Sequence, residues 1–321
     1  MLAAAAMTSA AQASADAQDA SNVLKMKPGA YVESAIGWNG PIEVKTTVSD
    51  NRIDSIEILK SDEVPYIADE PMKAIIQKVV SEQNLSVDVV TGASRSSEAL
   101  LRAVGQAVQA AGGRFVDVRQ TLADHKGEYI YYRTDHHWTS TGAYYAYQQL
   151  CTALGLTPFD PSAHTARTAE GFYGTHYSKA RTPDAEPDTI TYYDLPNALT
   201  IYTVTAPGQP AEGETTGLYD TDKLSVYDKY AMFLHGNNGL SRIKGDGTGR
   251  GRILVIKDSY ANCFVPYLTA NYADIDVVDF RNYNYGLDQL IADNGYDQIL
   301  VLYSFDSFKS DPYLYRAGAA G

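Results

Sequence analysis

The sequence predicts a small α+β domain followed by an α/β domain. In the first third of the chain, two alternating segments typical of paired strands are accompanied by two stretches with helical spacing of apolar residues. In the last third, short apolar strands alternate with helices, a pattern typical of an α/β sheet. The length of 321 residues suits two domains of ordinary size. We expect a leader over 1–27, the first domain over 28–112 and the second over 113–321.

The leader is rich in alanine. A short apolar run over 1–7 is followed by an Ala-x-Ala pattern at 11–13. These features resemble the back end of a secretory signal without its basic region, and they fit a disordered Ala/Ser segment equally well. The first interpretation predicts an extracytoplasmic protein, secreted or associated with the cell envelope. No apolar run in the sequence approaches the roughly 20 residues that span a bilayer.

The composition excludes some classes of function and favours others. Hydrophobic residues make up 45% of the chain, which is enough for real cores. The formal net charge is −13 and no basic patch is visible, so we expect no nucleic-acid partner. The 25 tyrosines favour partly wet grooves that face carbohydrate, although an ordinary tyrosine-rich surface is the alternative. Cys151 and Cys263 define no disulfide framework and no metal site, so we expect buried free thiols.

The elements of the first domain follow from periodicity. Residues 41–48 and 51–59 alternate apolar and polar side chains, and the Ser-Asp-Asn turn between them predicts a hairpin. A helix is predicted over 69–83 with a proline in its first turn, and a short strand over 86–90. A second helix is predicted over 97–111, where two glycines end it.

The second domain is predicted to open with a strand over 115–118. A helix over 140–154 ends at Gly155, and the polar residues that follow indicate loops and short strands. The remaining predicted elements are strands over 252–256, 275–278 and 298–302, with a helix over 286–293.

The first chemical signal is Asp-Val-Val-Thr-Gly-Ala-Ser-Arg-Ser-Ser at 88–97, at a strand-to-helix junction. Gly92 and Ala93 let the backbone approach a ligand, and the free N–H groups at the start of the helix favour a phosphate. Several hydroxyls in the same segment are additional donors. The residues alone leave open a plain helix cap with a Ser/Thr-rich turn.

This motif, preceded by a hairpin and a helix, resembles the FMN-binding domain of respiratory and extracytoplasmic flavoproteins over about residues 29–111. The resemblance implies FMN as the cofactor and electron transfer as its role. It also implies a flavin transferase as a partner, because that family's hydroxyl residue after Gly-Ala can be esterified by the FMN phosphate. Ser94 holds this position here, where the family most often has threonine. The implied cofactor-binding residues are Asp88, Thr91, Gly92, Ala93, Ser94 and Ser97.

The second chemical signal is Asp-His-His-Trp at 135–138. A carboxylate beside an imidazole fixes its tautomer and supports its charged form. Ser259 is the best candidate nucleophile, because it follows a buried strand at a turn that lifts a hydroxyl above a sheet edge. Packing or metal binding by the histidines and helix capping by the serine remain open. No metal site is expected, since no third ligand stands at standard spacing.

The segments Tyr-Arg-Thr-Asp-His-His-Trp-Thr-Ser and Ile-Lys-Asp-Ser-Tyr resemble the DHHW family, which is similar to the SGNH-hydrolase-like acetyltransferases of exported polysaccharides. The resemblance implies that Asp135 orients His137, that His137 is the general base and that Ser259 is the nucleophile. The pair Gly236 and Asn237 resembles a loop that supplies an oxyanion donor together with the Ser259 N–H.

The same resemblance implies the fold of the second domain, a flavodoxin-like three-layer α/β arrangement. Family members carry a longer α/β segment before residue 115, where the flavin-type domain stands in this chain. We therefore expect that the sheet of the second domain is truncated at its start.

Together, the resemblances imply an exported FMN-binding protein with an acyltransferase or esterase domain. Its implied partners are a cell-surface polysaccharide and an acyl donor. One alternative is a non-enzymatic FMN electron carrier whose DHHW domain only binds glycan. A structural surface protein with neither activity is a third.

Overall fold

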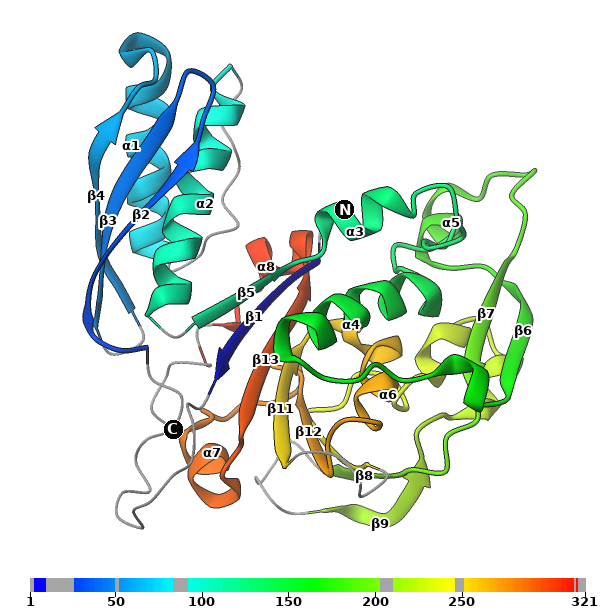
Figure 1. Ribbon diagram of the computed structural model, residues 1–321. Coiled ribbons are helices and arrows are strands. Elements are labelled where there is room, and N and C mark those ends of the chain that lie inside the picture. Colours follow the sequence, from blue (N-terminus) through cyan, green and yellow to red (C-terminus); the bar gives the residue numbers. More distant parts are fainter. Residues whose placement is uncertain are drawn as a thin grey trace. The chain divides into compact units, whose positions relative to one another are not determined.

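The computed structural model describes residues 3–9, 26–49, 52–82, 92–111, 113–202, 210–245, 251–314 and 316. The chain divides into two compact units (Figure 1). The first is Ala6–Phe115, and the second unites Met1–Ala5 with Val116–Gly321.

The first unit contains an antiparallel sheet of three strands, in the order β2 (Gly29–Ile36), β3 (Pro41–Ser49) and β4 (Arg52–Ser61). Side chains along β3 alternate between fully and partly buried, as the period-two pattern predicts. The β3–β4 pair confirms the predicted hairpin. Strand β2 was not predicted, because its sequence lacks a clean alternation of apolar and polar residues. In agreement with this, its apolar Val32 and Ile36 are 50% and 67% exposed.

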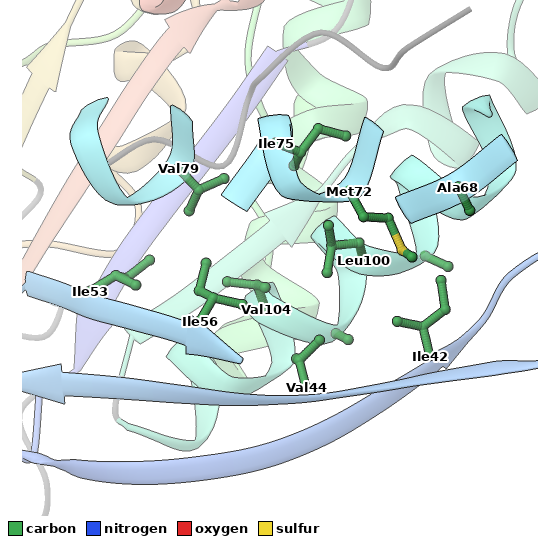
Figure 2. Packing of buried hydrophobic residues seen from close by; sticks show 12 residues of the cluster. Ile42, Val44, Ile53, Ile56, Ala68, Met72, Ile75, Val79, Leu100 and Val104 are labelled. Carbon is green, nitrogen blue, oxygen red and sulfur yellow. The ribbon is translucent and has the colours of Figure 1, made fainter. Parts of the chain in front are cut away.

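Two helices, α1 (Pro65–Glu82) and α2 (Ser94–Ala110), pack against this sheet. Figure 2 shows apolar side chains of both helices meeting those of the strands. The labelled members of this buried cluster are Ile42, Val44, Ile53, Ile56, Ala68, Met72, Ile75, Val79, Leu100 and Val104. Helices on one face of an antiparallel sheet make the unit α+β, as predicted.

Helix α1 begins four residues before the predicted start, so Pro71 lies inside it rather than in its first turn. Pro65 opens the helix, where a missing N–H costs nothing. Pro71 does remove a helical hydrogen bond. The helix continues through it because the flanking Ala68 and Met72 are buried against the sheet, and tertiary packing outweighs local propensity.

A mixed sheet contains most of the strands of the second unit. Its strand order is β5 (Gly113–Asp117), β1 (Ala3–Ser9), β13 (Gln298–Ser304), β11 (Arg252–Lys257), β12 (Asp274–Val278), β10 (Leu240–Lys244), β8 (Ala198–Tyr202) and β9 (Pro210–Gly217). Strand β11 pairs in parallel with β12 and β13, whereas β10 is antiparallel to β12 and β8. The α/β class is confirmed, but the antiparallel strands depart from the parallel sheet of a flavodoxin-like domain.

Strand β1 lies within the segment expected to be a leader. Residues 3–9 join the sheet between β5 and β13, so the expectation of disorder is wrong for them. Backbone groups of almost any sequence can enter a ladder, which is why composition alone does not exclude a strand here. Residues 10–25 lie outside the described part of the chain.

Helix α4 (Ser140–Leu154) has the predicted bounds. The Thr139 hydroxyl accepts a hydrogen bond from the Gly142 N–H at 3.3 Å, which caps the first turn. Gly155 ends the helix in the left-handed conformation, with φ of 63°, a conformation that favours glycine. The two cysteines are buried free thiols, as expected.

Shorter elements complete the second unit. They are α3 (Arg119–Asp124), β6 (Ala166–Phe172), α5 (Thr175–Ala180), β7 (Asp188–Tyr193), α6 (Val265–Leu268), α7 (Asp288–Asn294), α8 (Phe305–Ser310) and the 3₁₀ helices η3 (Lys229–Met232) and η4 (Ser259–Cys263). Strands β6 and β7 form a separate antiparallel pair. Among the described helices, none combines the length and the hydropathy needed to cross a membrane.

Candidate active site and flavin site

Ser259 stands where the buried strand β11 gives way to η4. Its neighbour Asp258 fixes this turn through both carboxylate oxygens. One accepts a hydrogen bond from the Tyr260 N–H at 2.9 Å, and the other accepts one from the Ser304 N–H at 3.0 Å, at the end of β13. The hydroxyl is therefore held at the carboxyl ends of parallel strands, where α/β sheets commonly bind ligands.

His137 and Asp135 complete a hydrogen-bonded chain with Ser259. His137 Nε2 lies 2.8 Å from Ser259 Oγ, and His137 Nδ1 lies 2.5 Å from Asp135 Oδ1. The same carboxylate oxygen accepts the His137 backbone N–H at 3.0 Å. The structure thus brings together the three residues that the sequence singled out, although Ser259 lies more than a hundred positions after the other two.

The second oxygen of Asp135 is also held. It accepts hydrogen bonds from the Thr175 N–H at 2.8 Å and from the Thr175 hydroxyl at 3.0 Å. Gly174 lies so close that a Cβ there would collide with the Asp135 carboxylate. Burial alone would raise the pKa of Asp135, but hydrogen bonds from both histidines and the charge of His137 hold it well below its usual range.

His137 itself is buried, and burial lowers its pKa below the ordinary value of 6.5, although Asp135 opposes that shift. A neutral imidazole whose Nδ1–H points at Asp135 leaves Nε2 free to accept the serine proton. The ring of Tyr230 stacks on that of His137, with centroids 3.9 Å apart and planes 11° apart. The Tyr230 hydroxyl donates to the Ser259 carbonyl at 3.0 Å, so one tyrosine holds both reacting residues.

Trp138 connects two segments of the site. Its indole N–H donates to the Tyr260 carbonyl at 2.8 Å, which ties the histidine loop to the serine turn. The Tyr260 hydroxyl returns a hydrogen bond to the His136 carbonyl. Several of the tyrosines counted in the sequence are therefore buried beside the Asp-His-Ser residues instead of lining an exposed carbohydrate groove.

Asp188 is a site-supporting residue that sequence reasoning missed. It is fully buried at the start of β7 and accepts the N–H groups of Arg133 at 2.9 Å and Thr134 at 2.7 Å. The hydroxyl of Tyr129 donates to it at 2.5 Å. These bonds hold the segment that leads into Asp135. No local signal could have revealed Asp188, because it lies more than 50 positions from its partners.

His136 turns away from the serine. Its Nδ1 lies 2.6 Å from the Thr175 hydroxyl, and its side chain is 38% exposed. Within the described residues, Asp135, His136 and His137 form a group whose ligand atoms are spaced for one metal ion. Hydrogen bonds already engage both nitrogens of His137 and both carboxylate oxygens of Asp135, so a metal ion bound by these two residues would compete with the Asp-His-Ser chain.

The Gly236-Asn237 pair differs in part from expectation. The Gly236 N–H donates to the Phe233 carbonyl at 3.0 Å, so it is not free for an oxyanion. The Asn237 carboxamide lies beside η4, and its Oδ1 accepts hydrogen bonds from Lys257 Nζ at 2.9 Å and from Asn262 Nδ2 at 3.1 Å. Its Nδ2 group has no protein acceptor within the described part of the chain. Lys257 is a second residue that sequence reasoning missed.

In the first unit, the flavin-type motif lies at the start of α2. Asp88 and Thr91 lie outside the described residues. Gly92 has a φ of 90°, and a side chain there would meet open space. Ser94 is exposed at the first position of the helix. An open backbone turn followed by an exposed hydroxyl and free helix N–H groups fits a phosphate ester.

Two other motif residues do not face a ligand directly. Ala93 is only 4% exposed, so its backbone alone is available to a ligand. Ser97 is fully buried, and its hydroxyl donates to the Ala93 carbonyl at 2.8 Å. Serine in a first helical turn readily bonds back to the preceding backbone, so the hydroxyl of Ser97 is engaged within the helix, and its contact with the cofactor stays a prediction.

Sequence reasoning also missed three residues around the flavin-type motif. Glu63 is 7% exposed and joins the β2–β3 turn to α2, since it accepts the Asn39 N–H at 2.9 Å and the Ser96 hydroxyl. Trp38, at the tip of that turn, is 65% exposed. The guanidinium of Arg95 lies 4.6 Å from the centre of its ring. The cation that follows Ser94 in the sequence therefore lies over an exposed aromatic ring.

These features define a two-part protein with a phosphate-type turn in one unit and an Asp-His-Ser chain in the other. Residues 84–278 match the family model described as DHHW protein, and residues 37–109 match that of the FMN-binding domain. The first match spans more than half of the chain, so the chain belongs to the DHHW family. The second match identifies FMN as the cofactor of the first unit.

Curated relatives resemble a limited part of the chain. An uncharacterized protein of Treponema pallidum (strain Nichols) is 37% identical over 86 residues, which are 26% of this chain and 24% of that protein. The NADH:acrylate oxidoreductase of Vibrio harveyi is 37% identical over 90 residues, which are 28% of this chain and 9% of that protein. The chain thus matches only a small share of either relative's length.

Solved structures resemble more of the chain. A DHHW family protein from Eubacterium siraeum has a TM-score of 0.56 at 23% identity, over 86% of this chain and 94% of that one. PatB1 of Bacillus cereus, in a structure with a sulfonyl adduct, has a TM-score of 0.50 at 18% identity, over 82% and 96%. At these identities the likeness shows the fold alone.

Proposed function

We propose that this protein binds FMN in its first unit and performs acyl transfer or ester hydrolysis in its second, on a cell-surface glycan outside the cytoplasm. The observation that carries the enzymatic half is the 2.8 Å separation of Ser259 Oγ and His137 Nε2, with Asp135 on the other ring nitrogen. A nucleophile, a base and an orienting carboxylate in hydrogen-bond contact are the signature of nucleophilic catalysis.

In the proposed reaction, Ser259 Oγ attacks the acyl carbonyl carbon while His137 Nε2 takes its proton. Asp135 stabilises the imidazolium that forms. The Ser259 N–H and Asn237 Nδ2 donate to the oxyanion. Collapse of the tetrahedral intermediate breaks the bond to the leaving group, which takes the proton from His137 and departs. Water or a sugar hydroxyl then attacks the acyl-serine with His137 as base, and Ser259 regains its proton on release.

The proposal includes an SGNH-like three-layer α/β fold for the second unit, in which antiparallel strands extend a flavodoxin-like parallel core. The likeness to PatB1 supports this class, and the parallel β13-β11-β12 core supports a site at its carboxyl edge.

For the flavin half, we propose that a flavin transferase attaches FMN to Ser94 through its phosphate. The exposed hydroxyl and the open turn at Gly92 support this assignment. Once bound, the flavin ring supplies one- or two-electron redox chemistry. The protein's own residues supply the tether at Ser94, a cation at Arg95 and an aromatic surface at Trp38.

The test of the enzymatic half is hydrolysis of 4-nitrophenyl acetate by the full chain. Ser259→Ala should abolish nitrophenol release above background, whereas the control Ser225→Ala, an exposed serine of the same unit, should leave it unchanged. Equal activity of wild type and Ser259→Ala would favour the other candidate, a non-enzymatic FMN carrier whose DHHW unit binds glycan. The similarity of 90 residues to the NADH:acrylate oxidoreductase of Vibrio harveyi supports that candidate.

A further inference from the structure

We infer that Lys257 is a positioning residue that sets which way the Asn237 carboxamide faces, so that Nδ2 is the group presented to the oxyanion formed at Ser259. This inference rests on the proposed acyl-transfer function. Lys257 ends β11, two residues before Ser259, and its side chain is 2% exposed. The mechanism above gives this buried cation no role.

The Asn237 carboxamide could face Lys257 with either its oxygen or its nitrogen. The oxygen and nitrogen of an asparagine side chain have nearly the same shape, and only the hydrogen-bond partners decide which end points where. Asn262 donates to Asn237 at 3.1 Å, but an amide partner can donate or accept, so Asn262 would tolerate either orientation. An ammonium group can only donate. Because Lys257 Nζ lies 2.9 Å from Asn237, the atom that faces it must be Oδ1.

Lys257 is held in place by a second partner. Its Nζ lies 3.1 Å from Asp279 Oδ2, and Asp279 is 1% exposed. Arg281 shares this carboxylate, with Nε at 2.9 Å from Oδ1. Burial lowers the pKa of Lys257, and the charge of Asp279 opposes the shift. The lysine is thus held between a carboxylate and the Asn237 oxygen, with its side chain almost fully buried.

The orientation of the Asn237 amide decides whether it attracts or repels the negative charge of the oxyanion. With Oδ1 turned toward Lys257, Asn237 offers N–H bonds to negative charge that develops beside Ser259. With the amide flipped, it would offer a carbonyl oxygen and repel that charge. A donor aligned before the reaction costs no reorganisation when the oxyanion forms, and loss of one such donor typically costs about 10²–10³ in kcat.

The experiment is a double-mutant cycle on 4-nitrophenyl acetate hydrolysis with Lys257→Met, Asn237→Ala and the double variant. Each single variant should lower kcat about 10- to 100-fold with KM changed less than about threefold. The double variant should be no slower than Asn237→Ala alone, because Lys257 acts through Asn237. Multiplied losses in the double variant, or an unchanged kcat in Lys257→Met, would overturn the inference.

A matched control separates positioning from folding. Arg242→Met removes a partly buried cation from the same sheet, where Arg242 pairs with the buried Asp276 at 2.7 Å. It should lower the melting temperature about as much as Lys257→Met and leave kcat near the wild-type value. A kcat loss as large as that of Lys257→Met would assign the effect to general destabilisation.

A second readout does not depend on activity. In protein labelled with ¹⁵N-asparagine, the side-chain signals of Asn237 are identified by their loss in Asn237→Ala. They should shift or split in Lys257→Met and stay in place in Arg242→Met. Unchanged signals in Lys257→Met would refute the orienting role even if wild type hydrolyses no ester, whereas an inactive wild type with shifted signals would refute only the proposed function.

Discussion

Asp135 shows how one side chain governs the proposed chemistry. Its two oxygens accept hydrogen bonds from His137 and Thr175 at distances of 2.5 to 3.0 Å. This arrangement selects the tautomer in which Nε2 faces Ser259 as an acceptor. The sequence predicted the pairing of Asp135 with His137 from their spacing. It could not predict Thr175, since that contact joins two segments about 40 positions apart.

We expect Asp135→Asn to lower kcat about 10³- to 10⁴-fold, because an amide can hold the imidazole in the wrong tautomer and cannot stabilise its charged form. The measurement is steady-state ester hydrolysis. Asp194→Asn, at an exposed aspartate that pairs with Arg167, is the control and should keep wild-type activity. A loss below tenfold in Asp135→Asn would show that Asp135 does not orient the base.

The pH dependence follows from His137. Its imidazole must be neutral to accept the Ser259 proton, so kcat/KM should fall as pH decreases through its pKa. Burial lowers that pKa below its ordinary value of 6.5, so the acid limb of the profile should be centred below pH 6.5. A pH–rate profile of kcat/KM checks this. An acid limb centred above pH 7 would contradict it.

At the scale of elements, short loops decide the geometry of the second unit's site. The start of α5 carries Thr175, and Gly174 before it allows that helix to approach Asp135. The start of β7 carries Asp188, which holds the segment before Asp135. Periodicity predicted helix α4 and the β11 strand because their apolar stripes are local. It could not predict these loop contacts, which depend on distant parts of the chain.

We expect Gly174→Ala to reduce kcat by at least tenfold, because the new methyl group would collide with the Asp135 side chain and shift it from His137. Gly127→Ala is the matched control, since a Cβ there meets nothing within contact distance. Circular dichroism of both variants should match wild type. Retained activity in Gly174→Ala would mean that α5 moves aside without cost.

At the scale of the whole molecule, two sites of unrelated chemistry belong to two separate compact units. Ser94 lies in the first and Ser259 in the second. The described contacts of each site come from its own unit. We therefore expect the Ser259 site to remain active without Ser94, and the flavin site to remain intact without Ser259.

Coexpression with a flavin transferase tests this expectation. Ser94→Ala should abolish flavin that stays attached after denaturation, while ester hydrolysis remains within about twofold of wild type. Ser94→Thr should keep the attachment, because it retains the hydroxyl. Ser259→Ala should show the reverse pattern, with flavin present and hydrolysis lost. Attached flavin in Ser94→Ala, measured by intact mass, would place the attachment elsewhere.

The sequence by itself determined the two-part organisation, the four longest of the described helices, several buried strands, and the residue types of both motifs. These follow from local periodicity, turn chemistry and short motifs, whose causes lie within a few residues of one another. Only the tertiary structure decided that Ser97 faces the helix backbone, that the Gly236 N–H is occupied, and that Lys257, Asp188 and Thr175 support the site. Such roles depend on which distant segments pack together, and local spacing carries no information about that.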